Sequence, residues 1–162
     1  MPTDLTPRQR TGVLATMCLA LIAVVASVSG LNVALTDLSV ELGASTAQVL
    51  WIVNAYTLTL AALLLGIGEI GDRFGRKRIL MIGLTVFAVA SGLSAFVDSS
   101  EQLIALRAVA GLGAAMIMPA TLSIITAVFP AEERGRAVGT WAGFAGAGGI
   151  LGLFVSAAII DY

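Results

Sequence analysis

The sequence predicts an all-α membrane protein with five transmembrane helices, and three observations support this prediction. Hydrophobic residues make up 58% of the chain and charged residues only 12%, whereas soluble domains average roughly 25% charged residues. The mean hydropathy is +0.98. The apolar residues also gather into runs of about 18 to 25 residues, the length that crosses a hydrocarbon core of about 30 Å. The predicted spans are residues 11–35, 47–68, 79–97, 103–129 and 137–160.

The first span, residues 11–35, could instead be read as a secretion signal, because it follows Arg8 and Arg10 and passes a stretch of small residues. The apolar part of a signal peptide is only about 7 to 15 residues long, and this run is much longer. We therefore expect the first span to remain in the membrane.

The charges between the spans justify the boundaries of the other four and predict the orientation of all five. Lysine and arginine near a span are retained on the cytoplasmic side during insertion, whereas acidic residues have little effect. The tail 1–10 and the second and fourth connections carry the basic residues, namely Arg8, Arg10, Arg73, Arg76, Lys77, Arg78, Arg134 and Arg136. The first and third connections carry only acids, namely Asp37, Glu41, Asp98 and Glu101. We therefore expect a cytoplasmic tail over residues 1–10, and a carboxyl end on the opposite face.

The composition excludes several function classes. There is no histidine and only one cysteine, Cys18, so a zinc centre, a disulfide framework and a histidine-dependent catalytic triad are not possible in this chain. Glu69 and Asp72 make a poor acid pair for catalysis, because four cations lie beside them. No basic patch interleaved with aromatic residues is present, so nucleic acid is not an expected partner. The sequence therefore predicts no enzyme activity, no metal and no cofactor.

A charged hinge between the second and third spans has the pattern Gly68-x3-Asp72-Arg73-x-Gly75-Arg76-Lys77. This pattern resembles the signature that the major facilitator superfamily carries between its second and third helices. The resemblance implies a conformational gate, in which Asp72 pairs with the amino terminus of a helix in the other half of the transporter. Such a contact contributes roughly 0.3 to 1 kcal/mol when exposed, and up to about 2 kcal/mol when partly buried, which suits a switch. An ordinary loop would explain the bases, but not Gly68 and Gly75, which allow close approach or a tight turn.

Arg107 is a charged residue about one turn into the fourth span. A central arginine costs about 2.5 to 3.5 kcal/mol on insertion scales, so it usually faces a polar interior. The segment around it resembles the fourth-helix motif of the same superfamily, which implies that Arg107 and Gly111 are candidates for proton coupling. Ala110 stands where the family usually has glutamine, and this departure weakens the implied proton relay. The alternative is an arginine that extends outward past the acids of the third connection.

The fifth span is rich in glycine and contains Gly139-x8-Gly148-x3-Gly152. This spacing resembles the motif that marks antiporters within the superfamily. The family motif continues with a proline, where this chain has Leu153, so we expect close helix packing without a proline kink. Packing of small residues alone is the alternative interpretation.

The first two spans resemble the multidrug exporters of the superfamily, particularly those with fourteen helices, through the runs 31–35 and 51–56. Those exporters commonly carry an aspartate and a proline where this chain has Ser27 and Thr36, so a carboxylate for proton movement would have to come from elsewhere. Polar stripes on both spans are candidates for lining a cavity, and interhelical hydrogen bonds are an equally good interpretation. The candidates are Ser29, Asn32, Trp51, Asn54 and Thr57.

The resemblance implies a fold as well as a function. The superfamily is built of six-helix halves, each made of two inverted three-helix repeats, with the substrate site between the halves. Residues 11–162 would be a partial amino-terminal bundle that is truncated before the sixth helix. Met1 is expected to be a genuine start, so the missing carboxyl-terminal half would follow this chain.

The function implied is that of a secondary active transporter in the plasma membrane, that is, a bacterial inner membrane. The expected partners are the lipid bilayer, a small-molecule substrate, protons and the missing half. Proton-coupled efflux of small hydrophobic or cationic compounds by alternating access is the leading hypothesis. An importer or facilitator of sugars or metabolites is one alternative. The other is a truncated membrane protein that does not transport and depends on a partner.

Overall fold

The computed structural model describes the backbone of residues 5–160 and the side chains of residues 5–32, 35 and 39–154. Over this backbone range the chain is helical and contains no strand, so the all-α prediction is confirmed. The helices are α1 (Pro7–Glu41), α2 (Thr46–Phe74), α3 (Arg76–Leu93), α4 (Ser100–Val128) and α5 (Ala131–Ile160), with a short 3-10 helix, η1 (Ser94–Phe96), after α3.

Each of the five helices contains a segment that is long and apolar enough to cross a membrane. Four of the helices are longer than the predicted spans, because polar residues at the ends continue the helical hydrogen bonding beyond the apolar part. The exception is α3, which begins three residues before the predicted span 79–97 but ends at Leu93, where the chain continues as η1. The clearest case of such an extension is the charged hinge. Its first part belongs to α2, which continues to Phe74, and the chain turns only at Gly75, with φ of 103°. The break between α2 and α3 is therefore a single residue, Gly75.

The α1–α2 and α3–α4 turns each end in a side-chain cap at the start of the next helix. Ser45 and Gln48 form a capping box at the start of α2: the Gln48 side chain accepts from the Ser45 backbone N–H, and the Ser45 hydroxyl accepts from the Gln48 backbone N–H. Ser99 caps α4 in the same way, by accepting from the Gln102 backbone N–H at 3.3 Å. These caps satisfy amide groups that would otherwise lack partners at the helix ends.

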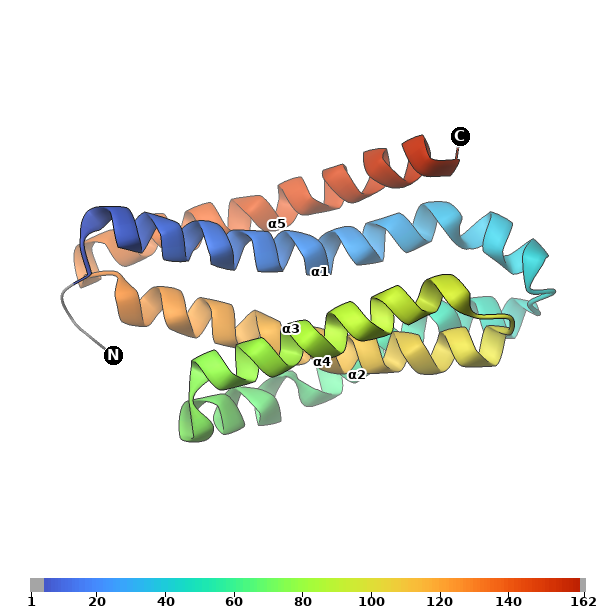
Figure 1. The fold of residues 1–162 in the computed structure, drawn as a ribbon, viewed down its shortest axis with the longest axis horizontal. Coiled ribbons are helices and arrows are strands. Elements are labelled where there is room, and N and C mark those ends of the chain that lie inside the picture. Colours follow the sequence, from blue (N-terminus) through green and yellow to red (C-terminus); the bar gives the residue numbers. More distant parts are fainter. Residues whose placement is uncertain (1–4, 161–162) are drawn as a thin grey trace.

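Helix α4 is the centre of the bundle. It packs against α1, α2 and α3, while α5 packs along α1 (Figure 1). Its buried residues include Ala114, Ile117 and Ile125, which lie in the main hydrophobic core. Glycines allow the close contact between α3 and α4: a Cβ at Gly113 would lie 2.8 Å from the Phe87 backbone nitrogen. Small residues therefore set the helix spacing here, as is common in membrane bundles.

The basic residues collect at one end of the bundle. The start of α1, the α2–α3 turn and the α4–α5 connection lie together at the end marked by the amino terminus in Figure 1. The connections that contain only acids lie at the opposite end (Figure 1). Of all lysines and arginines, only Arg107 lies away from the basic end. This arrangement is the one that the charge pattern predicts, and the assignment of the basic end to the cytoplasm stays a prediction.

Candidate gate and buried arginine

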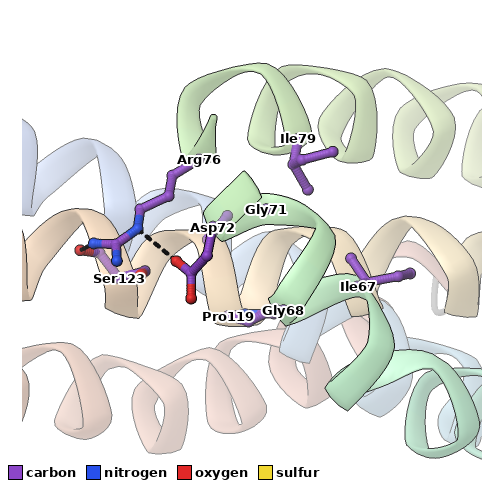
Figure 2. A pocket seen from close by; sticks show the side chains of 9 residues that line it. Ile67, Gly68, Gly71, Asp72, Arg76, Ile79, Pro119 and Ser123 are labelled. Carbon is purple, nitrogen blue, oxygen red and sulfur yellow. Dashed lines mark hydrogen bonds and ion pairs between the residues drawn. The ribbon is translucent and has the colours of Figure 1, made fainter. Parts of the chain in front are cut away.

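The charged turn at the basic end joins three helices. Arg76, the first residue of α3, donates from Nε to Oδ1 of Asp72 near the end of α2, at 2.9 Å. The same guanidinium donates from Nη1 to the backbone oxygen of Ser123 on α4, at 2.7 Å. Figure 2 shows the guanidinium between the carboxylate and the helix of Ser123. Arg76 thus connects the end of α2, the start of α3 and the side of α4.

A cavity of about 90 Å³ lies beside this junction, with Gly68, Gly71 and Pro119 among the residues that line it (Figure 2). Gly68 faces Pro119, but a Cβ at Gly68 would lie 3.8 Å from the Pro119 Cβ, which is ordinary contact. In this conformation the backbone therefore requires glycine at 75, for its positive φ, and not at 68.

The charged residues of the candidate gate are accessible to water. The Asp72 side chain is 62% exposed and that of Arg76 is 34% exposed. Arg73 and Lys77 are also exposed, and the Arg73 guanidinium lies 5.6 Å from the centre of the adjacent Phe74 ring. Exposed ion pairs typically contribute about 0.2 to 1 kcal/mol. The Asp72–Arg76 pair is therefore weak enough to exchange for another partner of Asp72.

Arg107 is buried between three helices, with 5% of its surface exposed. Its guanidinium carbon lies 4.3 Å from the centre of the Tyr56 ring on α2, within the range of a cation–π contact. Its Nη1 donates to the hydroxyl of Ser27 on α1 at 3.4 Å. The side chain therefore points into the bundle and does not extend outward past the acids of the third connection.

The surroundings of Arg107 leave polar atoms unsatisfied. Arg107 Nε and the Tyr56 hydroxyl are both buried and have no hydrogen-bond partner among the residues that the structure describes. Gly111, one turn further along α4, brings α2 close, because a Cβ there would lie 2.5 Å from the Tyr56 backbone oxygen. Sequence reasoning selected Arg107 and Gly111 but missed Tyr56. A tyrosine within an apolar span is the available signal, because a buried tyrosine hydroxyl usually has a partner.

Two of the three glycines in the predicted antiporter-like motif are at the α1–α5 contact. A Cβ at Gly148 would lie 3.1 Å from the Ile22 Cα, and one at Gly152 would lie 2.6 Å from the Ala26 backbone oxygen. Gly139 is exposed, and a Cβ there would meet nothing within 4 Å. The structure thus brings Gly148 and Gly152 to a tight interface and leaves Gly139 outside it.

The five cavity-lining candidates do not form one site in this structure. Ser29 is half-buried, and its hydroxyl lies 3.6 Å from the position of a Cβ at Gly149 on α5. The other four candidates are exposed, namely Asn32 on α1 and Trp51, Asn54 and Thr57 on α2. Asn32 and Thr57 donate to carbonyls of their own helices at 3.1 and 3.5 Å. Their role in a substrate cavity stays a prediction.

A larger groove was not expected from the sequence. It has a volume of about 910 Å³ and lies at the basic end, between α1, α3 and the end of α4. Apolar residues such as Val13, Met17 and Leu84 line it, together with Arg10 and Arg134. The groove leaves apolar surface of the bundle uncovered by the described part of the chain.

Comparisons with known proteins agree with this architecture. Residues 17–162 match the sequence profile described as "Major Facilitator Superfamily". The chain is 40% identical over 161 residues to the "Multidrug efflux pump LfrA" of Mycolicibacterium smegmatis, an alignment that covers 99% of this chain and 32% of the relative. It is 42% identical over 133 residues to the "Methyl viologen resistance protein SmvA" of Salmonella typhimurium, covering 82% of this chain and 27% of the relative.

A third relative is the "Methylenomycin A resistance protein" of Bacillus subtilis, which is 39% identical over 150 residues, covering 92% of this chain and 32% of the relative. The chain therefore spans about a third of the length of the relatives it matches. Its five apolar helices and these bacterial relatives make it a multi-pass protein of the plasma membrane. The match to the family profile covers nearly the whole chain, so the chain belongs to the Major Facilitator Superfamily, a family of membrane transporters.

Proposed function

We propose that the chain is the amino-terminal part of a secondary active transporter that exports small hydrophobic or cationic compounds in exchange for protons. The observation that carries this proposal is the 40% identity to a multidrug efflux pump over 99% of the chain. Relatives named for resistance to methyl viologen and to methylenomycin A support efflux over import. Because the alignments cover only about a third of each relative, the rest of the transporter must supply the second half of the cavity.

In the proposed mechanism, the weak Asp72–Arg76 pair is one state of a gate. When the two halves approach at the basic end, Asp72 exchanges Arg76 for the amino terminus of a helix in the other half. That contact contributes roughly 0.3 to 1 kcal/mol if exposed, and up to about 2 kcal/mol if partly buried. The exposed ion pair it replaces contributes about 0.2 to 1 kcal/mol, so the exchange is close to balanced and a bound substrate can decide it.

Arg107 is the residue of this chain that we expect to act in proton coupling. Arg107 is buried between α1, α2 and α4, where a positive charge would influence a nearby acid. Its partner on α1 is the hydroxyl of Ser27, which does not titrate near neutral pH. The carboxylate that carries the proton is therefore expected in the part of the transporter that this chain does not contain.

A second candidate function rests on the same contact. Because Ser27 stands beside Arg107 where the multidrug exporters commonly have an acid, an importer or facilitator of sugars or metabolites is the alternative. A partner-dependent protein that does not transport is the third possibility, and the groove lined by Val13, Met17 and Leu84 would then be a surface for its partner.

The first test is the intact mass of the native polypeptide extracted from its membranes. A mass about three times the 16.5 kDa of this chain is expected if it is part of a transporter of its relatives' length. A mass near 16.5 kDa would reject the autonomous transporter.

The second test is efflux of the lipophilic cation ethidium from cells that express the native protein. We expect efflux to stop when a protonophore collapses the proton gradient, and to fall by about 2- to 30-fold in Asp72→Asn, the range that corresponds to a contact of about 0.3 to 2 kcal/mol. Glu69→Gln is the matched control, because Glu69 is also an exposed acid near the end of α2 and has no ion pair among the described side chains. Efflux that survives the protonophore would reject proton coupling, and equal loss in both variants would reject a specific role for Asp72.

A further inference from the structure

Arg107 carries a buried charge that no described acid neutralises. The single ion pair among the described side chains is Asp72–Arg76, at the basic end. The acid nearest to Arg107 along α4 is Glu101, which is exposed and lies six residues earlier. Buried charges in proteins are normally paired, because an isolated ion is costly to remove from water. A cation–π contact and one long hydrogen bond from Nη1 do not remove that net positive charge.

The donors around Arg107 suit an anion. Within the described part of the chain, Arg107 Nε is buried without an acceptor, and the hydroxyl of Tyr56 is buried without a partner. The guanidinium of Arg107 contacts the Tyr56 ring. The Ser27 hydroxyl lies 3.4 Å from Nη1 and can also donate. Three helices thus bring a guanidinium and two hydroxyl groups to one place inside the bundle. These groups offer donors and positive charge, and the described side chains offer no negative charge in return.

We propose that Arg107, Tyr56 and Ser27 form a binding site for a small anionic group, which neutralises the guanidinium inside the membrane bundle. Guanidinium N–H groups and hydroxyls are suitable donors to both a halide ion and a carboxylate. A free chloride ion and a carboxylate on a substrate would use the same donors, so the two sources must be separated by experiment. Anion binding by these residues does not depend on the direction or the coupling of transport.

The experiment is thermal unfolding of the purified native polypeptide in detergent, followed by circular dichroism. Sodium gluconate, whose anion is too large for a site between packed helices, keeps the ionic strength constant while sodium chloride or sodium acetate replaces it. We expect one of the two small anions to stabilise the protein. At ten times its dissociation constant, the unfolding equilibrium constant should fall about 11-fold. Stabilisation by chloride alone would indicate a halide, and stabilisation by acetate alone would indicate a carboxylate.

Two variants make the test specific. Ser27→Asp places a carboxylate beside Arg107, so it should be stabilised in gluconate and should lose its response to the anion. Ser29→Asp is the matched control: it adds the same charge to α1, but position 29 faces α5, so the anion response should remain. A response that is unchanged in Ser27→Asp, or no response in the unmodified protein, would overturn the proposal.

A third variant removes the positive charge of Arg107. Arg107→Met keeps much of the side-chain length without the charge, and it should not respond to any of the anions. If this variant fails to fold, line broadening of the chloride-35 or acetate proton resonance by the unmodified protein and by Ser27→Asp gives a second measurement. Broadening that is equal in the two proteins would then reject the site. Loss of ethidium efflux would leave these results unaffected, because both readouts measure binding.

Discussion

The α1–α5 interface provides the most direct test of the packing. Replacing Gly152 with alanine would place a Cβ 2.6 Å from the Ala26 backbone oxygen and 2.8 Å from the Ala26 Cα. Both are backbone atoms of α1, so no side-chain rotation can relieve the clash. Carbon atoms pack best at about 3.5 to 4.0 Å, and the two helices must therefore separate by about 0.5 to 1 Å.

The expected cost follows from two opposing effects. Overpacking of this kind typically costs about 1 to 3 kcal/mol. The alanine also recovers roughly 0.8 to 1 kcal/mol of helix propensity, because glycine is unfavourable inside a helix. At Gly139 the added Cβ meets nothing within 4 Å. Gly139→Ala should therefore gain stability from helix propensity without any cost from overpacking. The difference in stability between the two variants should therefore be about 1 to 3 kcal/mol.

The measurement is the melting temperature of the two variants of the native protein in the same detergent. For a domain of about 150 to 250 residues, 1 kcal/mol shifts the melting temperature by about 2 to 4 °C. Gly152→Ala should therefore melt at least about 2 °C below Gly139→Ala. Equal melting temperatures would refute the reasoning, because they would mean that α5 does not approach α1 as closely at Gly152 as the structure indicates.

Two further predictions concern the charged turn. Gly75→Ala should lower the melting temperature, because a φ of 103° costs a residue with a Cβ about 1 to 3 kcal/mol, whereas Gly66→Ala, in open space inside α2, should not lower it. Arg76→Lys should destabilise the protein by about 0.5 to 1.5 kcal/mol in thermal unfolding. The single ammonium group of lysine cannot reach both Asp72 and the Ser123 carbonyl, as the Nε and Nη1 groups of the guanidinium do. A lysine variant as stable as the unmodified protein would contradict the bridging role of Arg76.

The sequence predicted the number and type of helices because the signal for a membrane span is strong and local. It placed the helix ends less well, because hydropathy marks where a helix leaves the hydrocarbon and not where its hydrogen bonding stops. The second helix is the clearest example. Its apolar part ends near residue 68, yet the helix continues to Phe74 through a stretch that includes Glu69 and Arg73, two residues with good helix propensity.

The candidate site was predicted in part. Arg107, Asp72 and Arg76 could be selected, because each is a charged residue at an unusual position in an apolar chain. The residues that they contact could not be predicted from the sequence. The contact between Arg107 and Ser27 joins residues 80 positions apart, and that between Arg76 and Ser123 joins residues 47 positions apart. A single sequence contains no signal for such pairs, because helix periodicity constrains only neighbours three and four residues apart.

The contact between Arg76 and Ser123 and the buried Arg107 both involve residues of α4. Arg107 and Ser123 lie on that helix 16 residues apart, which is about 24 Å along its axis. Pro119 lies between them and cannot donate a backbone hydrogen bond to Ala115, so α4 has a weak point just before the segment that contacts Arg76. A tilt of the end of α4 at Pro119 would move the Ser123 carbonyl that Arg76 contacts, while the core around Ala114 and Arg107 stays packed. The contact between Arg76 and Ser123 at the basic end can therefore move without disturbing the buried arginine.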